Sequence, residues 1–468
     1  MSLISPEIFK AYDIRGIVGK TLTASTVEAI GHALGAMALA QGHKTFAIGR
    51  DGRLSGPSLA EALGRGLRAC GVDTIDLGMV ATPITYFAAH HLGCGSAVSV
   101  TGSHNPPDYN GLKMVMGGVT LSGEAIQTLR GMVQACESAK GNDAPVTGAQ
   151  GQGKASAVDV IPAYLDRIAG DIRLARPLKV VLDCGNGVAG LTAGPLIRRL
   201  GCEVTELYCD VDGNFPNHHP DPSDPHNLVD LIATVQRNGA DLGLAFDGDG
   251  DRLGVVTPSG RIIYPDRQLM LFAKDVLSRC PGAEIIYDVK CTRQLAPWIR
   301  QHGGVPSMWR TGHSLIKARM KERKAPLAGE MSGHIFFGER WYGFDDGLYA
   351  AARLLEILSR EADPGAVLEA LPDSLSTPEL QWRLQEGEPH ALIHRLQQQA
   401  QFAGAQEVIT LDGVRVEYAD GFGLARASNT TPVIVLRFEA DNPQALSRIQ
   451  AAFRQALSPL KPDAALPF

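Results

Sequence analysis

Apolar, strand-like runs alternate with stretches of helical period along most of this chain, and this alternation limits the folds that it can adopt. TFAIG precedes PSLAEALGRGLRAC, KVVLD precedes LTAGPLIRRL, and EIIYD precedes CTRQLAPWIRQHG. Such a pattern predicts α/β domains whose sheets are largely parallel. The chain has 468 residues, which is enough for about three or four domains of roughly 100 to 200 residues each.

Two breaks in composition mark expected domain boundaries. The segment from Ser138 to Ala157, SAKGNDAPVTGAQGQGKASA, carries one sizeable apolar side chain and contributes little to a core. Several prolines in DPGAVLEALPDSLSTPEL form the second break. The segment after it ends in PVIVLRFEA and the amphipathic ALSRIQAAFRQAL, a pattern typical of a smaller α+β domain.

The charge balance and composition exclude several classes of protein. Lys and Arg total 44 against 50 Asp and Glu, a formal net charge of −6, so a basic nucleic-acid binder is not predicted. No apolar run approaches the roughly 18 residues of a membrane span, and MSLISPEIFK lacks the features of a secretory signal. The eight cysteines form no CxxC pair. We therefore expect a cytoplasmic protein with free thiols, without a nucleic-acid or membrane partner.

Three times, an apolar strand runs directly into a polar loop that contains glycine: SAVSV-TGSHNPP, LGLAF-DGDGDR and APLAG-EMSGH. Ligands of α/β sheets bind in loops at the carboxyl ends of the strands. We therefore expect the three loops to converge on a single cleft.

DGDGDR is the strongest candidate metal loop. Asp247, Asp249 and Asp251 alternate with two glycines that let the backbone bend their carboxylates around one point. A cluster of oxygen ligands suits Mg²⁺. An EF-hand is excluded, because its sixth position is Arg252 and its twelfth is Pro258, where glycine and glutamate are needed. Without a cation, three carboxylates this close would repel one another and raise their pKa values.

TGSHNPPDYNGLK places Ser103 in a turn directly after a strand, with His104 beside it and Lys113 further along. Adjacent side chains on an extended chain point to opposite faces, and no GxSxG elbow is present, so a hydrolase triad is not predicted. The simplest alternative interpretation of the motif is an ordinary serine turn.

GNGVAG, from Gly185 to Gly190, satisfies the G-x-G-x-x-G pattern of dinucleotide sites. Asp183 lies two residues before the first glycine and would repel a pyrophosphate. We therefore interpret the motif as structural and expect no nicotinamide or flavin.

Taken together, these loops closely resemble one family, the α-D-phosphohexomutases, in its bacterial phosphomannomutase/phosphoglucomutase branch. The match runs from FKAYDIRG to RASNTTPVIVLRFEA, with TGSHNPPDYNGLK and DGDGDR as its most specific elements and GEMSGH as the sugar-recognition loop. The resemblance implies three mixed α/β domains of similar topology and a smaller C-terminal α+β domain around a central cleft. We place these domains at residues 1–155, 156–258, 259–372 and 373–468.

The resemblance also implies the reaction, which belongs to the isomerase class. Ser103 would carry a covalent phosphate, and Asp247, Asp249, Asp251 and a phosphoserine oxygen would hold Mg²⁺. The phosphoryl group would pass to the 6-hydroxyl of glucose or mannose 1-phosphate, giving a hexose 1,6-bisphosphate that returns its other phosphate to the serine. Glucose 1,6-bisphosphate would thus act as intermediate and activator. The product would feed nucleotide-sugar and polysaccharide synthesis.

The resemblance further implies roles for single residues. Arg252 and Lys113 would neutralise the moving phosphoryl group. The candidates for proton transfer, among which the sequence does not choose, are Lys113, Arg15, His104 and His334. The residues that would grip the phosphate that is not reacting are Arg426, Ser428, Asn429 and Thr430. The residues that would bind the sugar or complete the pocket are Glu330, Ser332, His334, Tyr12, Lys290, Gly312 and His313.

Two other functions fit part of this pattern. In a metal-dependent sugar-phosphate phosphatase, Ser103 would be a passive ligand and water would take the phosphate. A phosphosugar-binding regulator would not catalyse a reaction at all. Neither function accounts for a reactive serine together with a separate phosphate clamp as well as a mutase does.

Overall fold

Three sheets in this protein share the same order of strands at their centre. We describe a computed structural model, in which residues 4–139, 152–429 and 431–468 are described. Each sheet contains three parallel strands that are successive in the repeat, and the first of them lies between the third and the second. The orders are β4 (Ala97–Val100), β2 (Thr45–Arg50), β3 (Asp73–Met79) in the first sheet, β10 (Leu242–Phe246), β8 (Lys179–Asp183), β9 (Glu203–Leu207) in the second, and β15 (Leu327–Gly329), β13 (Glu284–Asp288), β14 (Val305–Trp309) in the third. The loops that follow β4, β10 and β15 therefore occupy equivalent positions at the carboxyl edges of their sheets.

The chain forms two compact units, each built from several stretches of sequence. The first contains Met1–Pro265, Lys317–Lys324 and Ser332–Ala370, and the second contains Asp266–Ile316, Ala325–Met331 and Leu371–Phe468.

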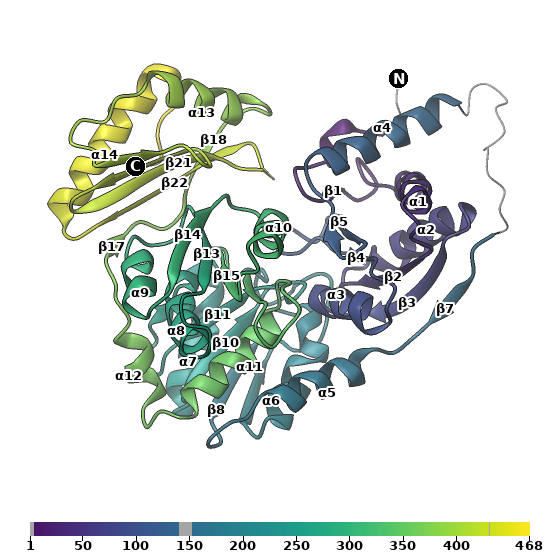
Figure 1. Ribbon diagram of the computed structural model, residues 1–468, viewed down its shortest axis with the longest axis horizontal. Coiled ribbons are helices and arrows are strands. Elements are labelled where there is room, and N and C mark those ends of the chain that lie inside the picture. Colours follow the sequence, from purple (N-terminus) through teal and green to yellow (C-terminus); the bar gives the residue numbers. More distant parts are fainter. Residues whose placement is uncertain (1–3, 140–151, 430) are drawn as a thin grey trace. The chain divides into compact units, whose positions relative to one another are not determined.

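The first sheet of unit 1 has the order β1-β5-β4-β2-β3-β7, with β6 paired to β5. Its strands are β1 (Ile14–Ile17), β2 (Thr45–Arg50), β3 (Asp73–Met79), β4 (Ala97–Val100), β5 (Tyr109–Met116), β6 (Val119–Thr120) and β7 (Ala155–Ala157). Its helices are α1 (Ala24–Ala40), α2 (Gly56–Ala69), α3 (Thr82–His91) and α4 (Glu124–Ala139). Because β2 leads to β3 on one side and β3 returns to β4 on the other, right-handed crossovers place α2 and α3 on opposite faces (Figure 1).

The second sheet of unit 1 has the order β12-β11-β10-β8-β9. Its strands are β8 (Lys179–Asp183), β9 (Glu203–Leu207), β10 (Leu242–Phe246), β11 (Leu253–Val256) and β12 (Ile262–Ile263). The further elements of unit 1 are α5 (Ile161–Asp171), α6 (Ala193–Arg199), α7 (Val229–Asn238), β16 (Ile335–Phe337), α11 (Gly347–Leu358) and α12 (Pro364–Glu369). Helix α7 packs on β8 and β10, and α11 packs on β10 and β11. The strand β10 is buried along its whole length, as expected for a central strand covered on both faces.

The third sheet contributes β13 (Glu284–Asp288), β14 (Val305–Trp309) and β15 (Leu327–Gly329) to unit 2. The helices beside these strands are α8 (Pro265–Arg279) and α9 (Leu295–Gln301). Helix α10 (His313–Arg323) begins in unit 2 and continues into unit 1.

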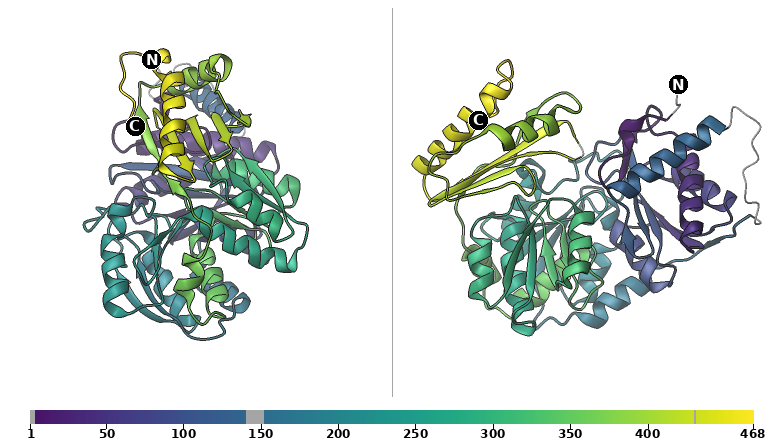
Figure 2. Two further views of the ribbon diagram at one scale, coloured as in Figure 1. Left: turned by 90° about the vertical axis from the view of Figure 1, so that its left-hand side faces the viewer. Right: turned by 45° about the horizontal axis from the view of Figure 1, so that its top comes forward.

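The C-terminal part of unit 2 is an antiparallel sheet with the order β17-β22-β21-β20-β19, and β18 also pairs with β22. Its strands are β17 (Leu375–Ser376), β18 (Leu380–Arg383), β19 (Glu407–Ile409), β20 (Val414–Tyr418), β21 (Gly421–Ala427) and β22 (Val433–Ala440). Helices α13 (Glu388–Gln399) and α14 (Pro443–Leu457) lie together on one face of this sheet (Figure 2). Asn442 caps α14 by accepting a hydrogen bond from the Ala445 N–H, and Pro443 follows it at the first helical position.

Three mixed α/β sheets and a C-terminal antiparallel sheet with two helices confirm the predicted fold class. The exact domain boundaries remain predictions. Among the described residues, no helix is both long and apolar enough to span a membrane.

Candidate active site

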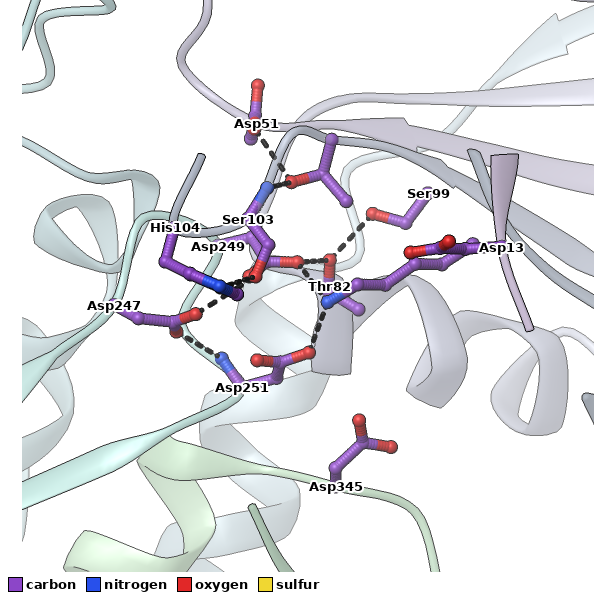
Figure 3. A network of polar contacts seen from close by, with 12 residues as sticks. Asp13, Asp51, Thr82, Ser99, Ser103, His104, Asp247, Asp249, Asp251 and Asp345 are labelled. Atoms are coloured by element: carbon purple, nitrogen blue, oxygen red, sulfur yellow. Dashed lines mark hydrogen bonds and ion pairs between the residues drawn. The ribbon is translucent and has the colours of Figure 1, made fainter. Parts of the chain in front are cut away.

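Ser103 lies in the loop after β4, and its hydroxyl points at the acidic loop after β10 (Figure 3). Its Oγ donates a hydrogen bond to Oδ2 of Asp247 over 3.2 Å. The serine is almost fully buried and has a φ of 50°, in the left-handed region that residues other than glycine rarely adopt. Two of the three predicted loops therefore meet.

The acidic loop brings three fully buried carboxylates together. One oxygen from each of Asp247, Asp249 and Asp251 lies within 4.8 Å of the others. The N–H groups of Asp251 and Arg252 donate to Oδ1 of Asp247 and close the turn. Oδ1 of Asp249 accepts no hydrogen bond from the described part of the chain. Converging carboxylates with an oxygen to spare fit a hard divalent cation.

Lys113 is the buried cation closest to these carboxylates. It lies on β5, and its Nζ is 2.7 Å from Oδ2 of Asp249 and 2.5 Å from Oδ2 of Asp251. Burial lowers the pKa of the ammonium, but the attraction of Asp249 and Asp251 outweighs it and the net pKa is raised. The lysine therefore stays charged and pairs with two of the three carboxylates, those of Asp249 and Asp251.

The carboxylates of the acidic loop do not share one pKa direction. Burial, followed by repulsion from Asp251 and Asp249, raises the pKa of Asp247 well above its ordinary value. Burial also raises the pKa of Asp251, but attraction by Lys113 and His334 outweighs it, so that pKa falls well below the ordinary value. The expectation that repulsion raises the pKa is thus confirmed for Asp247 and wrong for Asp251.

The sequence analysis missed two hydroxyls that support the acidic loop. Thr82, the first residue of α3, donates from Oγ1 to Oδ2 of Asp249 over 2.5 Å. The hydroxyl of Ser99 lies 2.8 Å from that of Thr82. A threonine at a helix start is so common that the sequence offered no signal for this role.

The expectation that Ser103 and His104 point to opposite faces is wrong. The Ser103 Oγ and the His104 Nδ1 are 3.3 Å apart. That expectation assumed an extended chain, whereas the left-handed backbone of Ser103 turns both side chains to the same side. Burial, followed by repulsion from Arg252 and Arg15, lowers the pKa of His104 well below its ordinary value. The imidazole is therefore neutral.

Residues of the third predicted loop also reach the acidic loop within unit 1. Nε2 of His334 lies 3.3 Å from Nε of Arg252 and 3.3 Å from Oδ1 of Asp251. The Ser332 hydroxyl lies 2.9 Å from Nδ1 of His334. Ser332 and His334 therefore lie beside the acidic loop.

Arg15 reaches the serine loop from β1. Its guanidinium donates to Oδ2 of Asp13 over 2.6 Å and to Oδ1 of Asn105 over 2.9 Å. Asn105 is two residues beyond Ser103, so Arg15 contacts the loop rather than the serine itself. Tyr12, three residues before Arg15, is half-buried.

In unit 2, the ends of β13, β14 and β15 are tied together by hydrogen bonds. Asp288 accepts from the hydroxyl of Thr311 over 2.9 Å and from the N–H of Met331 over 3.2 Å. Glu330 accepts from the N–H of Gly312. The predicted sugar ligands Gly312 and Glu330 are therefore in direct contact.

The predicted phosphate ligand Arg426 joins the same cluster. Oδ2 of Asp412 accepts from Nε of Arg426 over 3.0 Å and from the N–H of Thr311 over 3.0 Å. Lys290 lies in the same unit and donates to Glu379 over 2.6 Å. Arg426, Lys290 and His313 are all buried. The sequence analysis missed Asp288, Glu379 and Asp412, which are single acidic residues without a motif.

The segment after Arg426 forms a turn. The hydroxyl of Ser428 accepts a hydrogen bond from the N–H of Thr431. Asn429 is half-buried, and Thr430 lies outside the described residues. Apart from Thr430 and from His313, which begins α10, the predicted ligands of unit 2 thus lie in loops after strands or in this turn.

GNGVAG packs against the acidic loop. A Cβ on Gly187 would lie 3.0 Å from the Cα of Gly248 and 3.1 Å from the carbonyl oxygen of Asp247. Asp183 accepts from the N–H of Gly185 and contacts His218. This geometry gives the motif a structural role.

Comparison with known proteins identifies the family. The four models of phosphoglucomutase/phosphomannomutase match residues 6–140 (alpha/beta/alpha domain I), 162–260 (domain II), 264–375 (domain III) and 379–456 (C-terminal domain). The chain belongs to the phosphoglucomutase/phosphomannomutase family. A phosphoglucomutase of Neisseria gonorrhoeae is 58% identical over 458 residues, which cover 98% of each chain. A phosphomannomutase/phosphoglucomutase of Pseudomonas aeruginosa is 58% identical over 462 residues, covering 98% of this chain and 97% of that protein.

The crystal structure of a phosphoglucomutase/phosphomannomutase family protein from Burkholderia thailandensis matches with a TM-score of 0.92 and 57% identity, covering 100% of both chains. The names of these relatives support a hexose phosphate mutase, as the resemblance implied, and not the phosphatase alternative. Enzymes of this kind act on sugar phosphates, and the acidic triad of this chain fits a metal ion.

Proposed function

We propose that this phosphoglucomutase/phosphomannomutase family member transfers a phosphoryl group reversibly between C1 and C6 of glucose and mannose phosphates. In this proposal Ser103 carries the phosphoryl group and a hexose 1,6-bisphosphate is the intermediate. The observation that carries the proposal is the contact of the Ser103 hydroxyl with the buried triad of Asp247, Asp249 and Asp251, 3.2 Å from the first of them.

The three carboxylates and an oxygen of the phosphorylated Ser103 would hold Mg²⁺. The bound ion would supply positive charge that stabilises the phosphoryl group during transfer. Lys113 and Arg252 contribute fixed positive charge from the protein itself, since both are buried or nearly so and pair with the acidic loop. Their role is electrostatic, because neither gives up its proton easily.

Proton transfer requires a group that is neutral before the reaction. His104 meets this condition, and its Nδ1 lies 3.3 Å from the Ser103 hydroxyl. We therefore favour His104 over Lys113 and Arg15 as the acceptor of the proton from the attacking hydroxyl. His334, beside Asp251, is the second candidate.

The substrate ligands predicted from the sequence would bind the sugar phosphate. Arg426, Ser428, Asn429 and Thr430 would hold the phosphate that is not reacting, and Asp412 orients the Arg426 guanidinium for this purpose. The remaining substrate ligands would be Glu330, Ser332, His334, Tyr12, Lys290, Gly312 and His313. Glucose and mannose differ at C2, so we propose that both are accepted and that glucose 1,6-bisphosphate activates the enzyme.

Two further expectations belong to this proposal. The domains would span residues 1–155, 156–258, 259–372 and 373–468. The reaction would take place in the cytoplasm, a reducing compartment that suits free thiols such as Cys70, Cys184 and Cys291.

The test is the intact mass of the protein before and after incubation with glucose 1,6-bisphosphate. The wild type should gain one phosphoryl group on Ser103, and Ser103→Ala should gain none. Ser103→Ala should also lose most conversion of glucose 1-phosphate while still binding it. A variant that keeps wild-type turnover would exclude Ser103 as the carrier.

A further inference from the structure

We propose that Arg53, together with Asp51, positions Ser103 for phosphoryl transfer by fixing its loop in a conformation that serine disfavours. The inference rests on the proposed role of Ser103. Neither residue belongs to a motif singled out in the sequence, and neither contacts the acidic triad in the described structure. Arg53 would act through the serine loop and is therefore a positioning residue.

The loop needs such support because Ser103 has a φ of 50°. A left-handed backbone is unfavourable for any residue with a Cβ, and it persists only where the surroundings hold it. The conformation brings Oγ to Asp247 and also sets the carbonyl against the acidic loop, since a Cβ on Gly248 would lie 2.4 Å from the Ser103 oxygen. If the loop relaxes, the reacting hydroxyl therefore moves relative to the carboxylates.

The guanidinium of Arg53 uses all of its five donors on this region. Nη2 donates to the carbonyls of Ser103 and Asn105 over 2.9 and 2.5 Å. Nη1 donates to those of Pro106 and Tyr109 over 2.5 and 2.9 Å. One side chain thus holds four carbonyl groups between residues 103 and 109, and Nε remains for Asp51.

Asp51 holds the other side of the same loop. Its Oδ2 accepts from Nε of Arg53 over 3.2 Å, from the hydroxyl of Thr101 over 2.7 Å and from the N–H of Gly102 over 3.1 Å. Oγ1 of Thr101 in turn accepts from the N–H of Ser103 over 2.8 Å. The N–H and the carbonyl of Ser103 are therefore both fixed by one ion pair.

The ion pair of Arg53 and Asp51 is buried and closely packed. The Arg53 side chain is fully buried and lies over the ring of Phe215. Its guanidinium also lies flat against Gly102, where a Cβ would come within 2.4 Å of it. A lysine at position 53 would keep the charge but could not reach four carbonyls in a planar fork.

The test compares Arg53→Lys with a matched control, Arg353→Lys. Arg353 is an equally buried arginine of the same unit. It lies on α11 and pairs with Glu339, two residues after the end of β16, rather than with the serine loop. Both variants remove a buried guanidinium, so both should lower the melting temperature. Only Arg53→Lys should reduce kcat for glucose 1-phosphate, by about ten- to a hundredfold, with KM changed by no more than about twofold.

Hydrogen exchange provides a readout that does not depend on turnover. In Arg53→Lys the amides of residues 102–105 should exchange at least about tenfold faster than in the wild type, and in Arg353→Lys they should not. If the wild type itself has no mutase turnover, the proposed function fails while the exchange experiment still tests the role of Arg53.

An Arg53→Lys protein with unchanged loop exchange, or with kcat within about twofold of Arg353→Lys, would overturn the inference. If Arg53→Lys does not fold, Asp51→Asn serves instead, because it removes the charge but not the shape of the partner. The same exchange pattern and the same loss in kcat are then expected, and their absence would count against the inference.

Discussion

The Nζ atom of Lys113 lies 2.7 Å from Oδ2 of Asp249, and both side chains are buried. This pair offsets part of the charge of the acidic triad and leaves Oδ1 of Asp249 without a hydrogen bond from the described residues. The ammonium group of Lys113 therefore affects both the stability of the metal-free folded protein and the affinity of the acidic triad for a cation.

Replacing Lys113 by methionine should destabilise the metal-free protein by about 3 to 5 kcal/mol, because the buried carboxylates of Asp249 and Asp251 lose their counter-charge. Added Mg²⁺ should then raise the melting temperature more than it does in the wild type. Lys179→Met is the control, since Lys179 forms an exposed pair with Glu203 that is worth at most about 1 kcal/mol. A Lys113→Met protein as stable as this control in EDTA would contradict the prediction.

Asp346 should make stability depend on pH. Burial raises the pKa of this carboxyl from 3.8 to about 7 in the folded protein, where it caps α11 and accepts from the Tyr164 hydroxyl. The folded state binds the carboxyl proton more tightly than the unfolded state does. The contribution of Asp346 to the free energy of unfolding is therefore complete below about pH 4 and is lost as the pH rises to about 7. Across this range of pH the free energy of unfolding should fall by on the order of 4 kcal/mol.

Urea unfolding at pH 5 and pH 8 checks this prediction. Asp346→Asn keeps an acceptor for Tyr164 and for the Tyr349 N–H but does not titrate, so it should lose less stability between these pH values than the wild type. Asp363→Asn, at the exposed cap of α12, should behave like the wild type. Equal losses in the wild type and Asp346→Asn would contradict the expectation.

Replacing Arg426 by alanine should weaken the binding of glucose 1-phosphate by about ten- to a hundredfold, the cost of losing a hydrogen bond to a charged group. Calorimetric titration measures this change directly. Arg448→Ala removes an exposed arginine of the same antiparallel region, which pairs with Asp420, and should leave the affinity unchanged. If both variants bind alike, the phosphate is held elsewhere.

Gly187→Val should destabilise the protein by about 1 to 3 kcal/mol through overpacking, because the new side chain meets Gly248 and Asp247. The displaced acidic loop should also respond less to Mg²⁺ in a thermal melt. Gly170→Val on α5, where a Cβ meets nothing within 4 Å, is the control for adding a valine side chain without overpacking. Saturable binding of NADH to the wild type would contradict the structural role given to the motif.

Sequence patterns predicted the strands and the acidic loop well because each depends on neighbours in the chain. KVVLD is the strand β8 itself, and the three carboxylates of DGDGDR need only their own backbone to converge. The strand-to-loop repeat was also correct, since β4, β10 and β15 hold equivalent positions in their sheets.

Sequence patterns failed where a contact depends on a distant residue or on an unusual backbone angle. The proximity of His104 to Ser103 follows from a left-handed serine, which no alternation of residue types encodes. Arg53 reaches four carbonyls between 50 and 56 residues away along the chain, and only the folded sheet brings them near. Thr82 and Asp412 likewise owe their roles to partners far apart in sequence.

A buried aspartate stands at the carboxyl end of the first strand in all three repeats: Asp51 after β2, Asp183 on β8 and Asp288 on β13. Asp51 and Asp288 each accept an N–H from the loop after the third strand, at Gly102 and Met331, whereas Asp183 binds its own loop at Gly185. Duplication of one ancestral gene segment would leave such a trace. In two of the three repeats the carboxylate joins the first strand to the loop after the third, so loops of different chemistry are held at the same place on the same central strand order.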